Sequence, residues 1–184
     1  TAIVWSVAYS FDGQQLATGS DDKTAKIWDM STGRELMTVS GHDASIRCMA
    51  FSPRASRLAT GPEDGTLKIW STETGKNTTT IEGHASKIWC LAYSPDGNRL
   101  ATGHENQLAK IWDAESGEPL LSLNSHKRSV RSIAFSPDGT RLATGGYDNM
   151  AKVWELESNT ELIALTGHTA SVRSLAFSPA CPGN

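Results

Sequence analysis

The chain has 184 residues, of which 38% are hydrophobic and 20% are charged, a composition typical of an ordinary globular protein. Its formal net charge of −3 gives it no overall basic character, so we expect no nucleic-acid partner. No stretch reaches the roughly 18 consecutive apolar residues that a membrane-spanning helix needs, so we expect no membrane partner.

A block of 42 residues repeats along the chain. Four histidines keep this spacing, namely His42, His84, His126 and His168. Four tryptophans keep it as well, namely Trp28, Trp70, Trp112 and Trp154. Between residues 84–125 and 126–167, 18 of the 42 positions are identical. A fixed period of this size is typical of repeat proteins, in which each unit buries its apolar face against the next one.

The repeat divides the chain into units that we place at residues 1–41, 42–83, 84–125 and 126–167, with 168–184 beginning a fifth. Each complete unit has four short runs of strand-forming residues separated by turn signals. In the fourth unit these runs are Ser129–Phe135, Arg141–Gly145, Met150–Trp154 and Glu161–Leu165. The first turn, at 136–139, is Ser-Pro-Asp-Gly, in which proline presets φ and glycine accepts a positive φ. The last segment has only the first run, near Ser171–Phe177.

Four antiparallel strands in about 42 residues are typical of a propeller blade. Gly-His pairs at 41–42, 83–84 and 167–168, and Trp-Asp pairs at 28–29 and 112–113, stand where WD40 repeats have them. Ser125-His126, Trp70-Ser71 and Trp154-Glu155 depart from that pattern. The chain thus resembles the WD-repeat (WD40) family over nearly its whole length. The resemblance implies an all-β fold of β-propeller blades, here about four blades and one inner strand.

The resemblance also implies a buried hydrogen-bond chain in each blade, which runs from an acid through histidine and threonine to the tryptophan indole. Such a network would fix the loop between blades to the turn between the second and third strands. The residues concerned are His42, Thr60, Trp70 and Asp64; His84, Thr102, Trp112 and Asn106; and His126, Thr144, Trp154 and Asp148. Asn106 cannot stabilise an imidazolium, so we expect the third blade to be held more weakly.

A chain of aspartate, histidine and threonine resembles a nucleophilic triad. We nevertheless expect no catalytic residues, because the set recurs in every complete unit and an indole N–H can only donate to its hydroxyl. We expect no metal site, because histidines placed one per blade cannot converge on one ion. His104 lies outside the repeated series and is interpreted as a solvated turn residue. No phosphate-binding loop or paired cysteine motif is present, so no cofactor is expected.

Two positions vary from unit to unit. The first, near the start of the innermost strand, holds Trp5, Arg47, Trp89, Arg131 and Arg173. The second, just before the acid of the hydrogen-bond chain, holds Asp21, Glu63, Glu105 and Tyr147. In a propeller both lie around the mouth of the central channel, and the resemblance implies that this face binds partners. Alternatively, Trp5 and Trp89 are core residues. Near Arg131, Lys87, Lys127 and Arg128 form a basic arc or simply solvated surface.

The sequence therefore predicts a non-catalytic scaffold that binds a protein or peptide at the channel-mouth rim. A second hypothesis is a structural unit, natural or engineered, that completes a ring by association with copies of itself, most simply as a homodimer. WD-repeat propellers usually close with about seven blades, which is more than this chain supplies. An enzyme with its site at the channel mouth is the third alternative.

Three cysteines are present, namely Cys48, Cys90 and Cys181. Cys48 and Cys90 occupy equivalent places in neighbouring units, which seldom approach within the roughly 7 Å between Cα atoms that a disulfide needs. We expect small, buried, reduced side chains and a reducing compartment, the cytoplasm.

Overall fold

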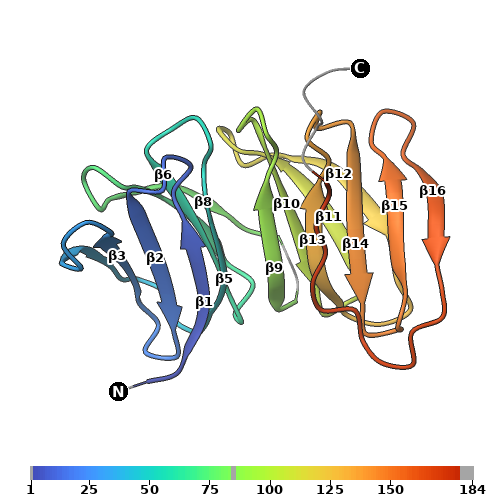
Figure 1. The fold of residues 1–184 in the computed structure, drawn as a ribbon, viewed down its shortest axis with the longest axis horizontal. Coiled ribbons are helices and arrows are strands. Elements are labelled where there is room, and N and C mark those ends of the chain that lie inside the picture. The colour runs from blue at the N-terminus through green and yellow to red at the C-terminus, as the bar shows by residue number, and fades with distance from the viewer. Residues whose placement is uncertain (1, 84–85, 179–184) are drawn as a thin grey trace.

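In the computed structural model, which describes residues 2–83 and 86–178, sixteen strands form four antiparallel sheets of four strands each. Within each sheet the strands follow one another in chain order, so every sheet is a meander. This all-β arrangement of four-stranded blades confirms the predicted propeller fold (Figure 1). Among the described residues, no helix is long and apolar enough to cross a membrane.

Each blade begins with its innermost strand and ends with its outermost one. Blade 1 contains β1 (Val4–Tyr9), β2 (Gln15–Ser20), β3 (Ala25–Asp29) and β4 (Glu35–Val39). Blade 2 contains β5 (Ile46–Phe51), β6 (Arg57–Pro62), β7 (Leu67–Ser71) and β8 (Asn77–Ile81). Blade 3 contains β9 (Ile88–Tyr93), β10 (Arg99–His104), β11 (Leu108–Asp113) and β12 (Pro119–Asn124). Blade 4 contains β13 (Val130–Phe135), β14 (Arg141–Gly146), β15 (Ala151–Glu155) and β16 (Thr160–Leu165).

The strands of blade 4 agree with the four predicted runs to within one residue at each end. The predicted turn at 136–139 is present as well. Gly139 has φ of 72°, and its N–H donates to the Ser136 carbonyl at 2.8 Å. The Asp138 carboxylate accepts from the Ser136 hydroxyl and from the Thr140 N–H. The Ser-Pro-Asp-Gly signal therefore gives the tight turn that joins the two inner strands of the blade.

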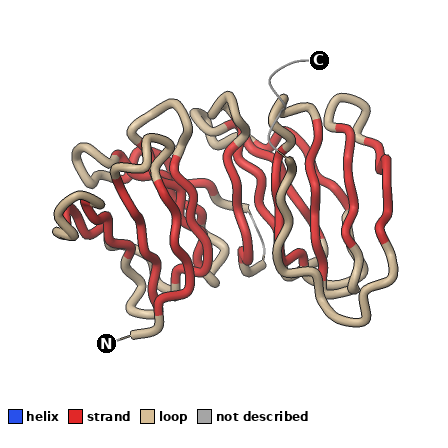
Figure 2. Tube along the Cα trace, in the orientation of Figure 1, coloured by secondary structure: helices blue, strands red, loops and turns tan. Residues whose placement is uncertain are grey.

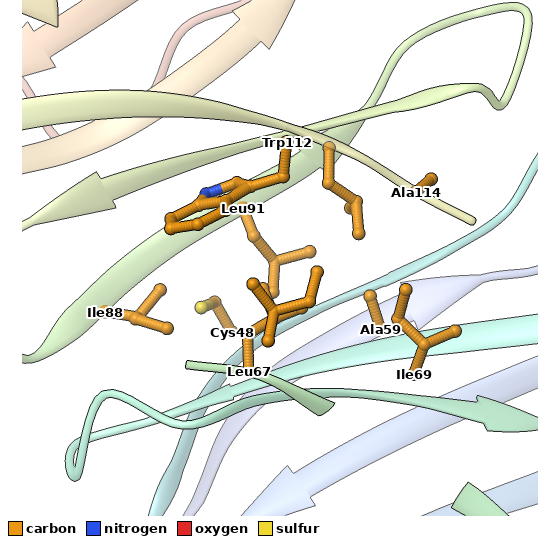
Figure 3. Packing of buried hydrophobic residues seen from close by; sticks show 10 residues of the cluster. Cys48, Ala59, Leu67, Ile69, Ile88, Leu91, Trp112 and Ala114 are labelled. Atoms are coloured by element: carbon orange, nitrogen blue, oxygen red, sulfur yellow. The ribbon is translucent and has the colours of Figure 1, made fainter. Parts of the chain in front are cut away.

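The hydrophobic core consists of three clusters, each lying between two neighbouring blades. Figure 3 shows the cluster between blades 2 and 3, where Leu67 and Ile69 pack against Leu91 and Trp112. Every cluster combines alanine and β-branched residues of one blade with leucine and tryptophan of the next. Because each cluster needs both blades, no blade buries its apolar faces alone, as the repeat predicts.

The two end blades leave uncovered the faces that the inner blades bury. Blade 1 lies at the left of Figures 1 and 2 and blade 4 at the right. Val7 in blade 1 is 63% exposed, whereas its equivalents in the next three blades, Met49, Leu91 and Ile133, are 6–8% exposed. Leu165 in blade 4 is 54% exposed, whereas its equivalents Val39, Ile81 and Leu123 are 1–2% exposed. Blades 1 and 4 therefore do not pack against each other to close a ring.

The fifth inner strand predicted near Ser171–Phe177 is not formed as a strand. Residues 171–178 nevertheless pass along blade 4, and the Val172 N–H donates to the Gly146 carbonyl at 3.1 Å. A Cβ at Gly145 would meet Val172, just as one at Gly103 would meet Val130 in the next blade. The segment thus lies in the position of an inner strand. It has no second strand of its own blade to pair with among the described residues, which explains why no ladder forms.

Cys48 and Cys90 are both free thiols in this structure. Cys48 is buried, and burial raises the pKa of its thiol well above the ordinary value. Burial likewise raises the pKa of Cys90 to about 12. Cys181 lies outside the described residues.

Candidate functional site

A β-bulge at the start of each inner strand positions the first variable series. In blade 1, Val4 pairs with Ser20 and Ser6 pairs with Gly19, so Trp5 is the extra, unpaired residue between them. The same shift leaves Arg47, Trp89 and Arg131 unpaired in blades 2, 3 and 4, respectively. A bulge bends the strand and re-aims the side chain of the extra residue. The repeat therefore places one side chain per blade outside the regular strand ladder.

These bulged side chains line a single pocket of about 320 Å³, together with Arg173 from the segment after blade 4. We refer to its lining as the inner rim, which consists of Trp5, Arg47, Trp89, Arg131 and Arg173. Trp5 is 46% exposed, so in this structure it is a rim residue rather than a core residue. The structure thus brings together all five members of the first variable series.

The second variable series meets the first in pairs that are sixteen residues apart. The Trp5 indole N–H donates to Asp21 Oδ1 at 2.5 Å. Arg47 donates to Glu63 Oε1 from both Nε and Nη2, at 2.8 and 2.7 Å. Arg131 lies over the Tyr147 ring, with Cζ 4.4 Å from the centroid. The exception is the pair in blade 3, Trp89 and Glu105. Glu105 is exposed, and the buried Trp89 indole nitrogen has no hydrogen-bond partner among the described residues.

Two arginines of the inner rim also stack on tryptophans of the preceding blade. Arg47 Cζ lies 3.8 Å from the Trp5 ring centroid, and Arg131 Cζ lies 3.7 Å from that of Trp89. Stacking suits the planar guanidinium, which is more weakly hydrated than an ammonium group. These contacts link neighbouring blades across the rim and hold the arginine side chains in place.

The predicted hydrogen-bond chain is complete in blade 4. The Trp154 indole N–H donates to Thr144 Oγ1 at 3.2 Å, and Thr144 Oγ1 lies 2.9 Å from His126 Nε2. His126 Nδ1 lies 2.8 Å from Asp148 Oδ1, and the Lys127 N–H donates to Asp148 Oδ2 at 2.8 Å. Burial by itself raises the pKa of Asp148, but the bonds from Lys127 and His126 outweigh it and lower that pKa below its usual value.

Blade 2 lacks the acid link, which corrects the prediction for Asp64. His42 Nε2 and the Trp70 indole N–H both meet Thr60 Oγ1, at 2.6 and 2.8 Å. Asp64 is instead exposed and accepts the Thr66 N–H. The buried His42 Nδ1 has no hydrogen-bond partner in the part of the chain that the structure describes.

In blade 3, His104 was predicted to be a solvated turn residue, and this prediction is wrong. His104 is fully buried, and its Nε2 lies 2.8 Å from Thr102 Oγ1, which also accepts the Trp112 indole N–H. His104 thus contacts the threonine to which the sequence assigned His84. His84 lies outside the described residues, and Asn106 is exposed.

One position, directly after the Thr-Gly pair of the second strand, differs in every blade. It holds Ser20, Pro62, His104 and Gly146 in blades 1 to 4. A Cβ at Gly146 would lie 2.5 Å from both His126 Nδ1 and Asp148 Oδ1, so glycine leaves the space that this pair needs in blade 4. The glycine at this position is a signal in the sequence that could have marked blade 4 as the one with the complete chain.

The repeats agree with a known family. The WD domain, G-beta repeat family matches five segments, at residues 1–29, 33–71, 75–113, 117–155 and 159–182. The chain belongs to the WD-repeat family. Proteins of this family generally act as non-catalytic interaction scaffolds.

Similar curated proteins share only part of this WD-repeat chain. The nuclear distribution protein PAC1-2 of Postia placenta is 58% identical over 41 residues, which are 22% of this chain and 10% of that protein. A ribosome biogenesis protein BOP1 homolog of Drosophila virilis is 45% identical over 53 residues, which are 29% of this chain and 7% of that protein. The chain therefore matches a tenth or less of the length of either relative, so the likeness concerns the repeats.

The low pKa values of two buried histidines predict that the WD-repeat fold loses stability in mild acid. Burial, followed by the charge of Lys68, lowers the pKa of His42 to about 4, and burial followed by Lys110 does the same for His104. In the unfolded chain histidine titrates near pH 6.5, so between about pH 6.5 and 4 the unfolded chain binds more protons. The stabilisation is fully present above that window and is lost as the pH falls through it.

Between pH 7 and pH 4.5 we expect the free energy of unfolding to fall less in His42→Gln than in the wild type. The two decreases should differ by up to about 3 kcal/mol. Urea denaturation at both pH values measures the difference. Equal losses in the two proteins would show that protonation of His42 does not drive acid unfolding.

The histidine–threonine network does not have the geometry of a catalytic triad. Thr144 is fully buried, and its hydroxyl oxygen already accepts an indole N–H, so it cannot reach a substrate. In residues 2–83 and 86–178, no group of three histidine, cysteine or acidic side chains could hold a metal ion.

Proposed function

We infer that this WD-repeat chain is a non-catalytic interaction scaffold that binds a protein or peptide at the inner rim. The observation that carries this proposal is the bulge repeated in each blade. It directs the variable residue of every unit into the same 320 Å³ pocket, while the remaining positions of the repeat build the blades. Tryptophan and arginine, which make up the whole lining of this pocket, are among the residues enriched at the energetic centres of protein interfaces.

A displayed library of random octapeptides tests the proposal. We expect enriched peptides whose binding is lost in Trp89→Ala and retained in Leu120→Ala, which removes an exposed apolar side chain from outer strand β12. Circular dichroism of both variants confirms that they fold. Failure to enrich any peptide that depends on Trp89 would contradict binding at the rim.

Self-association is a second candidate function, favoured by the uncovered end faces. In blades 1 to 3, one apolar face packs against the following blade, and blade 4 leaves the equivalent face exposed. In blades 2 to 4, the opposite face packs against the preceding blade, and blade 1 leaves that face exposed. A second copy can therefore repeat the packing already seen inside the chain. Large exposed apolar faces recruit other chains, and closed two-fold dimers are the commonest result.

We expect the chain to sediment as a dimer at micromolar concentration, and Val7→Asp to convert it to a monomer. Val7 is exposed in the isolated chain, so its replacement leaves the cores between blades intact. Leu120→Asp is the matched control, because it places the same charge on blade 3, away from both end faces. A wild-type chain that sediments as a monomer of 19.8 kDa would exclude self-association.

A further inference from the structure

Arg131 is held between two aromatic rings and has no acidic partner among the described residues. Its Cζ lies 3.7 Å from the Trp89 centroid and 4.4 Å from the Tyr147 centroid. Its buried Nε makes no hydrogen bond to any described residue. A charged donor without an acceptor is costly when it is partly removed from water. The side chain is therefore fixed in place and still lacks the anion that its chemistry requires.

Arg47 is the equivalent residue of blade 2, and its guanidinium does have acidic partners. It stacks on Trp5 as Arg131 stacks on Trp89, but it also pairs with Glu63 at 2.7 Å and lies 3.9 Å from Asp21. Lys87 lies 3.6 Å from the second oxygen of Glu63. The half of the rim built by blades 1 and 2 is thus neutralised from within the chain.

The other half of the rim carries an excess of positive charge. Lys127 and Arg128 line, with Arg131 and Tyr147, an adjoining pocket of about 330 Å³. Arg173 lines the inner-rim pocket beside Arg131 and donates to the Tyr147 hydroxyl at 2.8 Å. The carboxylate that borders these groups is Glu105, which is exposed and forms no ion pair with them. Arg131 lines both pockets and lies where they meet.

We propose that the site around Arg131 binds an acidic side chain of a peptide, whose carboxylate or phosphate oxygens pair with the guanidinium. This proposal rests on the proposed function of the rim and specifies the chemistry of its partner. The guanidinium presents donors in a planar fork that matches two oxygens of one anion. Because Trp89 and Tyr147 already fix the plane of that fork, little side-chain freedom is lost on binding.

The charge distribution favours a peptide over a nucleic acid. A nucleic-acid backbone would carry several phosphates past the neighbouring half of the rim, where Arg47 and Lys87 are already paired with carboxylates and offer no free cation. A single acidic side chain avoids those carboxylates and meets the positive half alone. The chain as a whole is also acidic, with a formal net charge of −3.

The octapeptide library also tests this proposal, because the sequences of the selected peptides show which residue types are enriched. We expect aspartate or glutamate to be enriched at one position of the selected peptides. Replacing that acid with glutamine is expected to weaken binding to the wild-type protein about 10-fold or more. In Arg131→Gln the same replacement in the peptide should have little further effect, since the two changes remove one interaction. Arg34→Gln, in an exposed loop, is the charge-matched control and should bind like the wild type.

The outcomes separate this proposal from the function on which it rests. Peptides that depend on Trp89 but show no acidic preference would overturn the acidic site and leave the rim function standing. Tighter binding of a single-stranded oligonucleotide than of any acidic peptide would also overturn it. Synthetic glutamate and phosphoserine versions of one peptide show which oxyanion is preferred, and stronger binding of either one than of the glutamine version supports the site. If Arg131→Gln does not fold, the wild-type comparison still decides.

Discussion

Replacing Trp70 with alanine is expected to lower the free energy of unfolding by about 3–5 kcal/mol, the usual cost of truncating a buried aromatic side chain. Trp70 is 4% exposed and packs in the core between blades 1 and 2. Its indole N–H donates to Thr60 at 2.8 Å, and its ring meets that of His42 edge to face at 5.8 Å. The substitution leaves a cavity between two blades and removes one donor from the buried threonine.

Trp28 offers a matched control, because it occupies the same place in blade 1 and donates to Thr18 at 2.9 Å. Among the described residues no other blade covers this face of blade 1, and Trp28 is only half-buried. We expect Trp28→Ala to cost clearly less than Trp70→Ala, as measured by urea denaturation of both variants at pH 7. Equal costs would mean that the tryptophan stabilises its own blade rather than the contact between blades.

The repeat made most of the fold predictable. A strand that is buried on one or both faces needs a regular pattern of apolar residues. This pattern recurs in four units, so an ambiguous strand boundary in one unit can be settled from the equivalent residues of another. The strands of blade 4 match their predicted bounds to within one residue for this reason. The exception was the run near Ser171–Phe177. Its pattern is that of a strand, but a strand exists only with a partner to pair with, and the sequence of the run alone does not supply one.

The sequence identified which residues line the inner-rim pocket, but not how their side chains are arranged. Comparison between units identified the residues of the inner rim, because their variation stands out against a constant background. The bulge that re-aims Trp5 and Arg131 has no signature in the residues themselves. The predicted hydrogen-bond chain was wrong in blade 2 for a different reason. Asp64 has the expected place in the sequence, but it is exposed and accepts the Thr66 N–H instead, and the sequence pattern is the same in either case. In blade 3 the prediction missed His104, which is buried against Thr102.

The space that Gly146 leaves for the histidine–aspartate pair predicts that blade 4 is the blade whose stability depends on its acid. Asp148→Ala is expected to lower the free energy of unfolding by about 1–3 kcal/mol, because it removes the acceptor of both His126 and the Lys127 N–H in a buried network. Asp64→Ala is the matched control. Asp64 is exposed and accepts only the Thr66 N–H, so we expect a cost of about 0.5 kcal/mol or less. Asp148→Asn should fall between the two, since its amide oxygen still accepts one bond.

Gly146→Ala tests whether space at this position is the cause. Its new Cβ would lie 2.5 Å from His126 Nδ1 and from Asp148 Oδ1, so one of these groups must move and their bond must lengthen or break. If that bond is what the glycine protects, Gly146→Ala and Asp148→Ala remove the same interaction, and their combined cost in a double-mutant cycle is less than the sum of the single costs. Strictly additive costs would show that Gly146 serves the backbone rather than the network. The cycle thus asks whether blade 4 is held by its acid because a glycine, and not a proline or histidine, follows the Thr-Gly pair.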